Sequence, residues 1–203
     1  MTRAVLASGS PGKLRELAAL LAPFSLQLAP QSEFGIRPAA ETGATFLENA
    51  LLKAHHAARH ARLPALADDS GLEVDALGGR PGVWSARFAG EGASDEQNLR
   101  QLLAELDDVP EGWRQARYQC VIVWVRSVGD QAPLVARGSW EGRIGHAPRG
   151  HGGFGYDPVF IPAGERRSAA ELTPVEKNAV SHRGQALRAL VAMLAAAGYI
   201  RTP

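Results

Sequence analysis

The chain has 203 residues, of which 45% are hydrophobic, so residues 1–203 are expected to form a single domain with a sizeable core. Its 22 basic residues nearly balance its 21 acidic residues, and the net charge is only +1. Because no strong positive field exists, we expect no binding to nucleic acid and no binding to an anionic membrane, which excludes the polyanion-binding classes.

The single cysteine and the N-terminal sequence both bear on the cellular compartment. Cys120 lies in an apolar run and has no second cysteine with which to form an internal disulfide, which favours a reducing environment. The N-terminal apolar stretch is too short for a signal peptide, and no apolar run elsewhere reaches the length of a membrane span. The expected location is therefore cytoplasmic.

Lysine is rare in this chain. Of the 22 basic residues, 19 are arginine and only three are lysine, namely Lys13, Lys53 and Lys177. Lysine presents a compact ammonium on a flexible stem, whereas arginine presents a planar fork. Sites that need a point charge against a phosphate or carbonyl oxygen therefore resist replacement of lysine by arginine. The alternative is that these three lysines remain by chance.

The first elements of the chain predict a phosphate-binding turn. Residues 4–8 form a short apolar run typical of a buried strand, and the glycine-containing turn that follows leads into a helix. Ser10 suits the N-cap of that helix and Pro11 its first position. A helix N-terminus offers backbone N–H groups and partial positive charge to an anion, and Lys13 lies in the first turn.

A second helix begins after Thr45, where the spacing to Glu48 is that of a capping box, and extends to about His60. Lys53 lies on its polar face. Glu41 belongs to the loop that leads into this helix and can supply an oxygen ligand to a metal ion. The alternative is a surface glutamate, which Glu41 taken alone favours.

Residues 65–71 predict a strand that ends in two carboxylates and a turn at Ser70 and Gly71, and the alternating residues 72–77 predict a separate strand after the turn. Adjacent strand residues point to opposite faces, so Asp68 and Asp69 cannot both reach one site unless the turn bends the backbone. Asp69 is better placed to hold a metal or activate a water, and Asp68 can bind a metal from the bend or cap the turn. The alternative is an ordinary solvated turn. Magnesium needs only one or two carboxylates, so Glu41 with Asp69 is a sufficient set.

The remaining elements alternate between helix and strand. A helix capped by Ser94 is followed by strands at about 116–126 and 134–140, then by a helix that starts at Thr173 and a final helix with an apolar stripe over 187–194.

The glycine-rich segment 149–158 is expected to be a loop. It holds Phe154 between two glycines, which suits an aromatic ring that stacks on a nucleobase. Lys177 and the run 181–183 add hydrogen-bond donors that can read a carbonyl oxygen on such a base. The alternative for this run is a helix boundary with Ser181 as its N-cap.

Together these segments resemble the inosine triphosphate pyrophosphatase family. The matching motifs occur in family order and span nearly the whole chain. They are Ser8-Gly-Ser-Pro-Gly-Lys13, Glu41-Thr-Gly-x-Thr-Phe-x-Glu-Asn-Ala-x-x-Lys53, Ala67-Asp-Asp-Ser-Gly-Leu72, Gly152-Gly-Phe-Gly-Tyr-Asp-Pro158, and Lys177 with Ser181-His-Arg-Gly-Gln-Ala-Leu187. Every lysine of the chain falls within them.

This resemblance implies an α/β fold with a central twisted mixed sheet flanked by helices, in two lobes with an active-site cleft between them, and usually a homodimer. It implies hydrolysis of noncanonical purine nucleoside triphosphates (ITP, dITP, XTP) to the monophosphate and pyrophosphate, with Mg²⁺ required. Asp69 is implied as general base and metal-site residue, with Glu41 as a further metal-site residue. The triphosphate is implied to bind Ser8, Gly9, Ser10, Pro11, Gly12, Lys13, Lys53 and Ser70. The base is implied to bind Phe154, Gly155, Tyr156, Asp157, Lys177, His182 and Arg183.

One departure leaves alternatives open. The family's first motif usually has threonine and asparagine where this chain has Ser8 and Ser10, and Ser10-Pro11 is similar to the opening of the Maf family, whose members cleave pyrimidine and modified nucleotides. A Maf-like pyrophosphatase acting on dTTP or UTP is therefore one alternative, and a non-catalytic nucleotide-binding regulator is another.

For selectivity, the C6 carbonyl of inosine or xanthosine can accept a hydrogen bond from Lys177 or Arg183. Adenine presents an amino donor there, and each unpaired donor costs about 1 to 3 kcal/mol.

Overall fold

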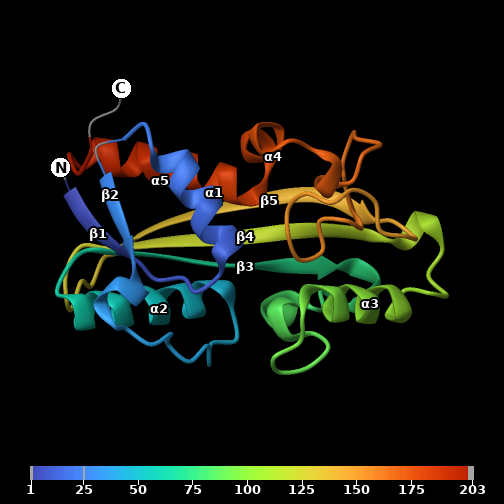
Figure 1. Cartoon of the computed structure of the whole chain (residues 1–203), viewed down its shortest axis with the longest axis horizontal. Coiled ribbons are helices and arrows are strands. Elements are labelled where there is room, and N and C mark those ends of the chain that lie inside the picture. The colour runs from blue at the N-terminus through green and yellow to red at the C-terminus, as the bar shows by residue number, and fades with distance from the viewer. Residues whose placement is uncertain (1, 25, 201–203) are drawn as a thin grey trace. The chain divides into compact units, whose positions relative to one another are not determined.

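The computed structural model describes residues 2–24 and 26–200 (Figure 1). Its strands are β1 (Thr2–Leu6), β2 (Leu26–Pro30), β3 (Ala65–Val74), β4 (Gln115–Val125), β5 (Leu134–Ile144) and β6 (Phe160–Pro162). Its α-helices are α1 (Pro11–Leu21), α2 (Phe46–Ala61), α3 (Asp95–Glu105), α4 (Pro174–Val180) and α5 (His182–Ala196). Short 3₁₀ helices lie in several of the connections.

The strands pair in the order β2-β1-β3-β4-β5-β6 over the described residues. β1 runs parallel to β2 and to β3, whereas β5 and β6 are antiparallel, so the sheet is mixed. Helices flank it, and the predicted α/β class is confirmed (Figure 1).

Local sequence signals account for where the helices begin. Ser10 accepts a hydrogen bond from the backbone of Lys13, and Pro11 occupies the first position of α1. Capping boxes start the next helices, with Thr45 at α2, Ser94 at α3 and Thr173 at α4. Each cap binds backbone N–H groups that have no partner within the helix itself, so the predicted starts of these helices are confirmed.

The chain divides into two compact units. Unit 1 comprises residues 1–69, 120–138 and 183–203, and unit 2 comprises residues 70–119 and 139–182. The prediction that residues 1–203 act as one domain, and the predicted cleft, stay predictions.

Unit 1 has two apolar clusters because strand residues alternate between the faces of the sheet. Ala4 and Leu6 of β1 face a cluster that includes Leu17 of α1 and Leu190 of α5. Val5, which lies between them, belongs instead to a cluster with the alanine face of α2, which consists of Ala50, Ala54, Ala57 and Ala58. Figure 1 shows α1 and α5 on one side of these strands and α2 on the other.

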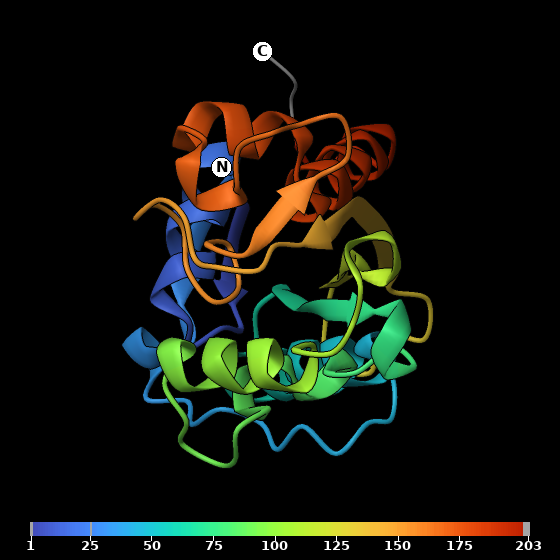
Figure 2. The same cartoon turned by 90° about the vertical axis from the view of Figure 1, so that its right-hand side faces the viewer.

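Unit 2 has its own core. Leu72 and Val74 of β3 are fully buried there and pack in one cluster with Leu99 and Leu102 of α3. The strand β3 and the helix α3 can be followed in Figure 2. The glycine-rich segment 149–158 has no regular structure, as predicted.

One predicted boundary is wrong. β3 continues without a break through Ser70 and Gly71 to Val74, so these residues do not form a turn and no separate strand follows. The physical reason is burial, because the alternation that places Leu66 in the core of unit 1 continues to Leu72 in the core of unit 2. β5 likewise extends beyond the predicted end to Ile144, which is fully buried.

Candidate active site

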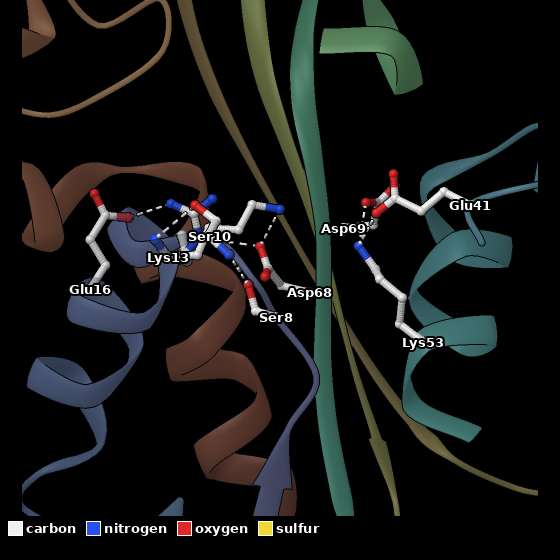
Figure 3. Close-up of polar contacts among 9 residues, drawn as sticks. Ser8, Ser10, Lys13, Glu16, Glu41, Lys53, Asp68 and Asp69 are labelled. Carbon is white, nitrogen blue, oxygen red and sulfur yellow. Dashed lines mark hydrogen bonds and ion pairs between the residues drawn. The ribbon is translucent and has the colours of Figure 1, made fainter. Parts of the chain in front are cut away.

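The adjacent carboxylates of β3 lie on opposite faces of the strand. Figure 3 shows Asp68 on the side of α1 and α5, and Asp69 on the side of α2. Because β3 is regular at this point, the backbone does not bend to bring the two carboxylates together. The predicted separation of Asp68 and Asp69 is therefore confirmed, and each has its own cluster of charges.

Asp68 lies in a buried ion-pair cluster. Its Oδ2 is 3.1 Å from Lys13 Nζ and 3.3 Å from Arg183 Nε, and its side chain is 0% exposed. Glu16, three residues after Lys13 on α1, forms an ion pair with the other end of Arg183. Burial opposes ionisation of Asp68, but the charges of Lys13 and Arg183 outweigh it, so the pKa of Asp68 is well below its ordinary value.

The start of α1 is the turn for which the sequence predicts phosphate binding. The backbone N–H of Ser10 donates to Ser8 Oγ at 3.3 Å, and the backbone N–H of Lys13 donates to Ser10 Oγ at 3.4 Å. Ser10 therefore accepts at its oxygen and keeps its hydroxyl proton for a ligand. A β-carbon on Gly9 would meet no atom within 4 Å, so the backbone there is open to close approach by a ligand.

Asp69 belongs to a cluster on the other side of β3. Lys53 Nζ is 2.6 Å from Asp69 Oδ1 and 3.0 Å from Glu41 Oε1, so one ammonium lies between two carboxylates (Figure 3). Burial by itself lowers the pKa of Lys53, but the charges of Asp69, Asp68 and Glu41 raise it overall. Burial also raises the pKa of Asp69, and the neighbouring lysines only partly oppose that effect.

This second cluster fits a hard divalent cation. Its formal charge is negative, since Lys53 offsets only one of the two carboxylates of Glu41 and Asp69. Among the described residues no group of three or more His, Cys, Asp or Glu side chains gathers as a metal site. Mg²⁺ usually takes one or two carboxylates and leaves its other positions to water and phosphate, so such a sparse set is sufficient.

The third predicted metal ligand, Asp68, does not lie with Asp69 and Glu41. Asp68 is paired with Lys13 and Arg183 on the opposite side of β3, so its metal role stays a prediction that its contacts do not favour. Ser70 follows Asp69 in β3 and is half-buried. By the alternation of the strand its side chain shares the face of Asp68.

In unit 2, the glycine-rich segment gathers the predicted base-binding residues around one buried ion pair. Lys177 Nζ is 2.5 Å from Asp157 Oδ2, and both side chains are buried. The same ammonium lies 4.8 Å from the ring centre of Phe154, a cation–π distance. Gly153 and Gly155 both have positive φ, and Asp157 Oδ2 accepts from the backbone N–H of Phe154 at 2.9 Å, so the glycines let the loop fold onto Asp157.

Neighbouring elements of unit 2 hold this loop. Gly155 N–H donates to Asp95 Oδ2 at the start of α3 at 2.8 Å. The Tyr156 hydroxyl donates to the carbonyl oxygen of Ser85 at 2.8 Å, and the Tyr156 ring is buried. The two residues that follow Phe154 are thereby held in place, which suits a stacking platform.

His182 stacks on an aromatic ring that contacts the same ion pair. Its ring is 4.6 Å from that of Tyr118 with an interplanar angle of 8°, and the Tyr118 hydroxyl donates to Asp157 Oδ1 at 3.4 Å. The structure therefore brings Phe154, Lys177 and His182 into one network with Asp157 and Tyr118.

Arg183 is a predicted base-binding residue that lies outside this network and outside the glycine-rich loop. Its side chain is 2% exposed and pairs with Asp68 and Glu16 in unit 1, so its contact with the base stays a prediction. Sequence reasoning missed Glu16, Asp95 and Tyr118. The one available signal was the spacing of Glu16 from Lys13, which places both on the same side of α1.

Comparisons with known proteins identify the family of this chain. A family model described as the Ham1 family matches residues 4–193. A protein named dITP/XTP pyrophosphatase from Methylococcus capsulatus is 59% identical over 192 residues, which cover 95% of this chain and 96% of that protein. A protein of the same name from Escherichia coli K12 is 56% identical over 191 residues, covering 94% and 97%.

Solved structures give the same result for the fold. The structure of a HAM1 protein from Coxiella burnetii matches with a TM-score of 0.89 at 48% identity and covers 96% of this chain and 99% of that chain. The Ham1 protein of Staphylococcus aureus matches with a TM-score of 0.84 at 37% identity over 96% and 99% of the two chains. The family resemblance predicted from the motifs is confirmed, and the chain belongs to the Ham1 family.

Proposed function

We propose that this chain hydrolyses the noncanonical purine nucleoside triphosphates ITP, dITP and XTP to the monophosphate and pyrophosphate, with Asp69 as general base. The observation that carries the proposal is the position of Lys53 between Asp69 and Glu41. Relatives at 56% and 59% identity bear the name dITP/XTP pyrophosphatase, which supports the purine substrate over the Maf-like alternative.

Asp69 is suited to accept a proton from water. Burial raises its pKa, so its carboxylate is a stronger base than an ordinary aspartate. The 2.6 Å contact with Lys53 holds Asp69 Oδ1, and it orients the carboxylate. Asp69 and Glu41 are the residues that would hold Mg²⁺, which when bound supplies positive charge that offsets the charge of the phosphates.

The triphosphate is assigned to the start of α1 and to Lys53. Lys13 and the N-terminal backbone of α1 supply positive charge, and the hydroxyls of Ser8 and Ser10 supply hydrogen bonds. Because Lys13 also neutralises Asp68, its ammonium is already oriented before the substrate arrives. Such preorganisation reduces the entropy lost on binding.

The base is assigned to the network around Asp157 in unit 2. Phe154 offers a stacking face, and Lys177 offers a donor to the C6 carbonyl of inosine or xanthosine. Asp157 holds that ammonium at 2.5 Å, which directs the Lys177 side chain. An adenine amino group would face a donor and leave both groups unpaired, so ATP is disfavoured.

The remaining predicted properties belong to this proposal. They are action as a homodimer, a cytoplasmic location, and an absence of nucleic-acid and membrane partners. Among the residues that the structure describes, no helix has both the length and the apolar character needed to cross a membrane.

A product assay across a nucleotide panel with Mg²⁺ tests the proposed function. We expect pyrophosphate release from inosine and xanthosine triphosphates to exceed that from ATP, GTP, dTTP and UTP. Faster turnover of dTTP or UTP supports the Maf-like alternative instead. Binding of the purine nucleotides without any product supports the regulator, and release of orthophosphate contradicts the predicted bond.

A further inference from the structure

Glu41 lies in a segment without regular structure. Residues 36–43 connect a short 3₁₀ helix to α2, and no strand or helix sets the position of Glu41. Its carboxylate nevertheless lies 3.0 Å from Lys53 Nζ in the middle of α2. Something must therefore hold this segment against α2.

Asn49 contacts this segment two residues after Glu41. Its Oδ1 accepts from the backbone N–H of Gly43 at 2.8 Å, and the residue is fully buried. Because Gly43 supplies a donor, the oxygen rather than the nitrogen of the carboxamide must face it. Asn49 also lies one helical turn before Lys53, so both side chains lie on the face of α2 that the segment covers.

The orientation of the Asn49 carboxamide lowers the stability of the fold. Its Nδ2 atom is buried and has no hydrogen-bond partner among residues 2–24 and 26–200. An unpaired buried donor is destabilising, and asparagine is also a weak helix former inside a helix. An apolar side chain would avoid both costs, so the contact with Gly43 is what Asn49 contributes here.

Gly43 is pressed against the first turn of α2. A β-carbon on Gly43 would lie 2.6 Å from Glu48 Cβ and 2.8 Å from Asn49 Oδ1. Earlier in the segment, a pocket lies between the backbone and α2. Its lining residues from the segment are Pro38, Ala39, Ala40 and Thr42, and those from α2 include Leu51, Leu52 and His55. The segment is thus held at Gly43 by Asn49 and at the carbonyl of Arg37 by His56, at 2.9 Å.

We propose that Asn49 is a positioning residue, which holds the Gly43 end of this segment so that Glu41 stands opposite Lys53 and Asp69. This inference rests on the proposed function, since it assigns Glu41 to the divalent cation. Glu41 is two residues from the Gly43 anchor and four from the Arg37 anchor. Loss of the Asn49 contact therefore frees Glu41 more directly than loss of the His56 contact.

α3 offers a matched control at the same helical position. Asn98 follows the capping box of α3 as Asn49 follows that of α2, and it is also buried. Asn98 holds the segment before its own helix, accepting from Ala89 N–H at 2.8 Å and donating to the Ala86 carbonyl at 3.1 Å. Replacement of Asn98 removes a comparable clamp but does not touch Glu41.

The test compares Asn49→Leu with Asn98→Leu and Asn49→Asp. We expect Asn49→Leu to raise the Mg²⁺ concentration for half-maximal pyrophosphate release about tenfold, while turnover at saturating Mg²⁺ changes less. Asn49→Asp keeps an acceptor for Gly43 and restores the wild-type half-saturation, and Asn98→Leu leaves it unchanged. An unchanged half-saturation in Asn49→Leu, or equal loss in Asn49→Asp, overturns the proposal.

Hydrogen–deuterium exchange without nucleotide is the readout independent of activity. In Asn49→Leu we expect exchange in residues 41–44 to accelerate about tenfold while α3 is unaffected. If Asn49→Leu does not fold, Gly43→Ala displaces the same segment with Asn49 intact, and it should show the same two changes. If residues 41–44 exchange at the wild-type rate in every folded variant, Asn49 does not hold this segment and the proposal is overturned.

A double-mutant cycle shows whether Asn49 acts through Glu41. In a Glu41→Gln background, Asn49→Leu should raise the Mg²⁺ half-saturation less than twofold, whereas a full additional tenfold increase overturns the proposed route. If the wild type releases no pyrophosphate from any nucleotide, the proposed function fails. The exchange experiment still decides whether Asn49 holds the Glu41 segment.

Discussion

The two sides of β3 at Asp68 and Asp69 both combine basic and acidic side chains, yet they differ in charge balance. On the Asp68 side, Lys13 and Arg183 face Asp68 and Glu16, so the formal charges cancel. On the Asp69 side, Lys53 alone faces Asp69 and Glu41, which leaves a net negative charge. The pKa values of the two aspartates also shift in opposite directions. Burial raises the pKa of Asp69, whereas at Asp68 the charges of Lys13 and Arg183 outweigh burial and lower the pKa.

This difference in charge assigns a structural role to the Asp68 side and a chemical role to the Asp69 side. A buried, neutral set of charges stabilises the positions of α1, β3 and α5 and tolerates removal of a partner poorly. A set with one uncompensated carboxylate attracts a cation and contains a base with a raised pKa. We therefore predict that changes on the Asp68 side are seen first in stability, and changes on the Asp69 side in turnover.

The largest expected effect on stability comes from Asp68→Asn. The change leaves Lys13 and Arg183 facing a neutral group in a buried site, and we expect the free energy of unfolding to fall by about 3 to 5 kcal/mol. Chemical denaturation measures this. Asp75→Asn, which breaks the more exposed pair with Arg117, is the control and should cost less than about 1 kcal/mol. Equal losses of unfolding free energy in Asp68→Asn and Asp75→Asn would show that the buried cluster contributes no more to stability than the exposed pair.

A smaller loss is expected for Glu16→Gln. Glu16 pairs with one end of Arg183, and Arg183 keeps its contact with Asp68 when that charge is removed. We expect the free energy of unfolding to fall by about 1.5 to 3 kcal/mol, the range for a hydrogen bond to a charged group. Glu96→Gln on the exposed face of α3 should change it by less than about 0.5 kcal/mol. An unchanged free energy of unfolding in Glu16→Gln would show that Glu16 does not stabilise the cluster of Lys13, Asp68 and Arg183.

The smallest expected signal is the reactivity of Cys120. Burial, followed by the nearby charge of Asp68, raises the pKa of this thiol to about 12. At pH 8 the thiolate is scarce and buried, so a thiol reagent should label the native chain negligibly and the denatured chain fully. Mass spectrometry after timed labelling measures this. Rapid labelling of the native chain would show that the Asp68 side is open to solvent.

Local signals predicted the parts of this site that depend on neighbours in sequence. Capping boxes placed α2 and α3, and the period of a strand placed Asp68 and Asp69 on opposite faces. The contact between Lys53 and Asp69 was not derivable in this way, because α2 must first pack on the sheet to bring them together.

Signals that depend on the tertiary structure were misread or missed. Ser70 and Gly71 favour a turn by residue type, but burial of Leu72 and Val74 extends β3 through them. Arg183 follows His182 directly, yet the two side chains join different networks, because Asp68 and Glu16 attract the guanidinium at the start of α5. Such long-range partners leave no periodic pattern in the sequence.

Steady-state pyrophosphate release from inosine triphosphate by Asp69→Asn tests the account most directly. The change keeps the size of the side chain but removes its ability to accept a proton, so we expect turnover at saturating Mg²⁺ and nucleotide to fall by about 100- to 10,000-fold. The folded content, measured by circular dichroism, should match the wild type. Turnover equal to that of the wild type would show that Asp69 is not the general base.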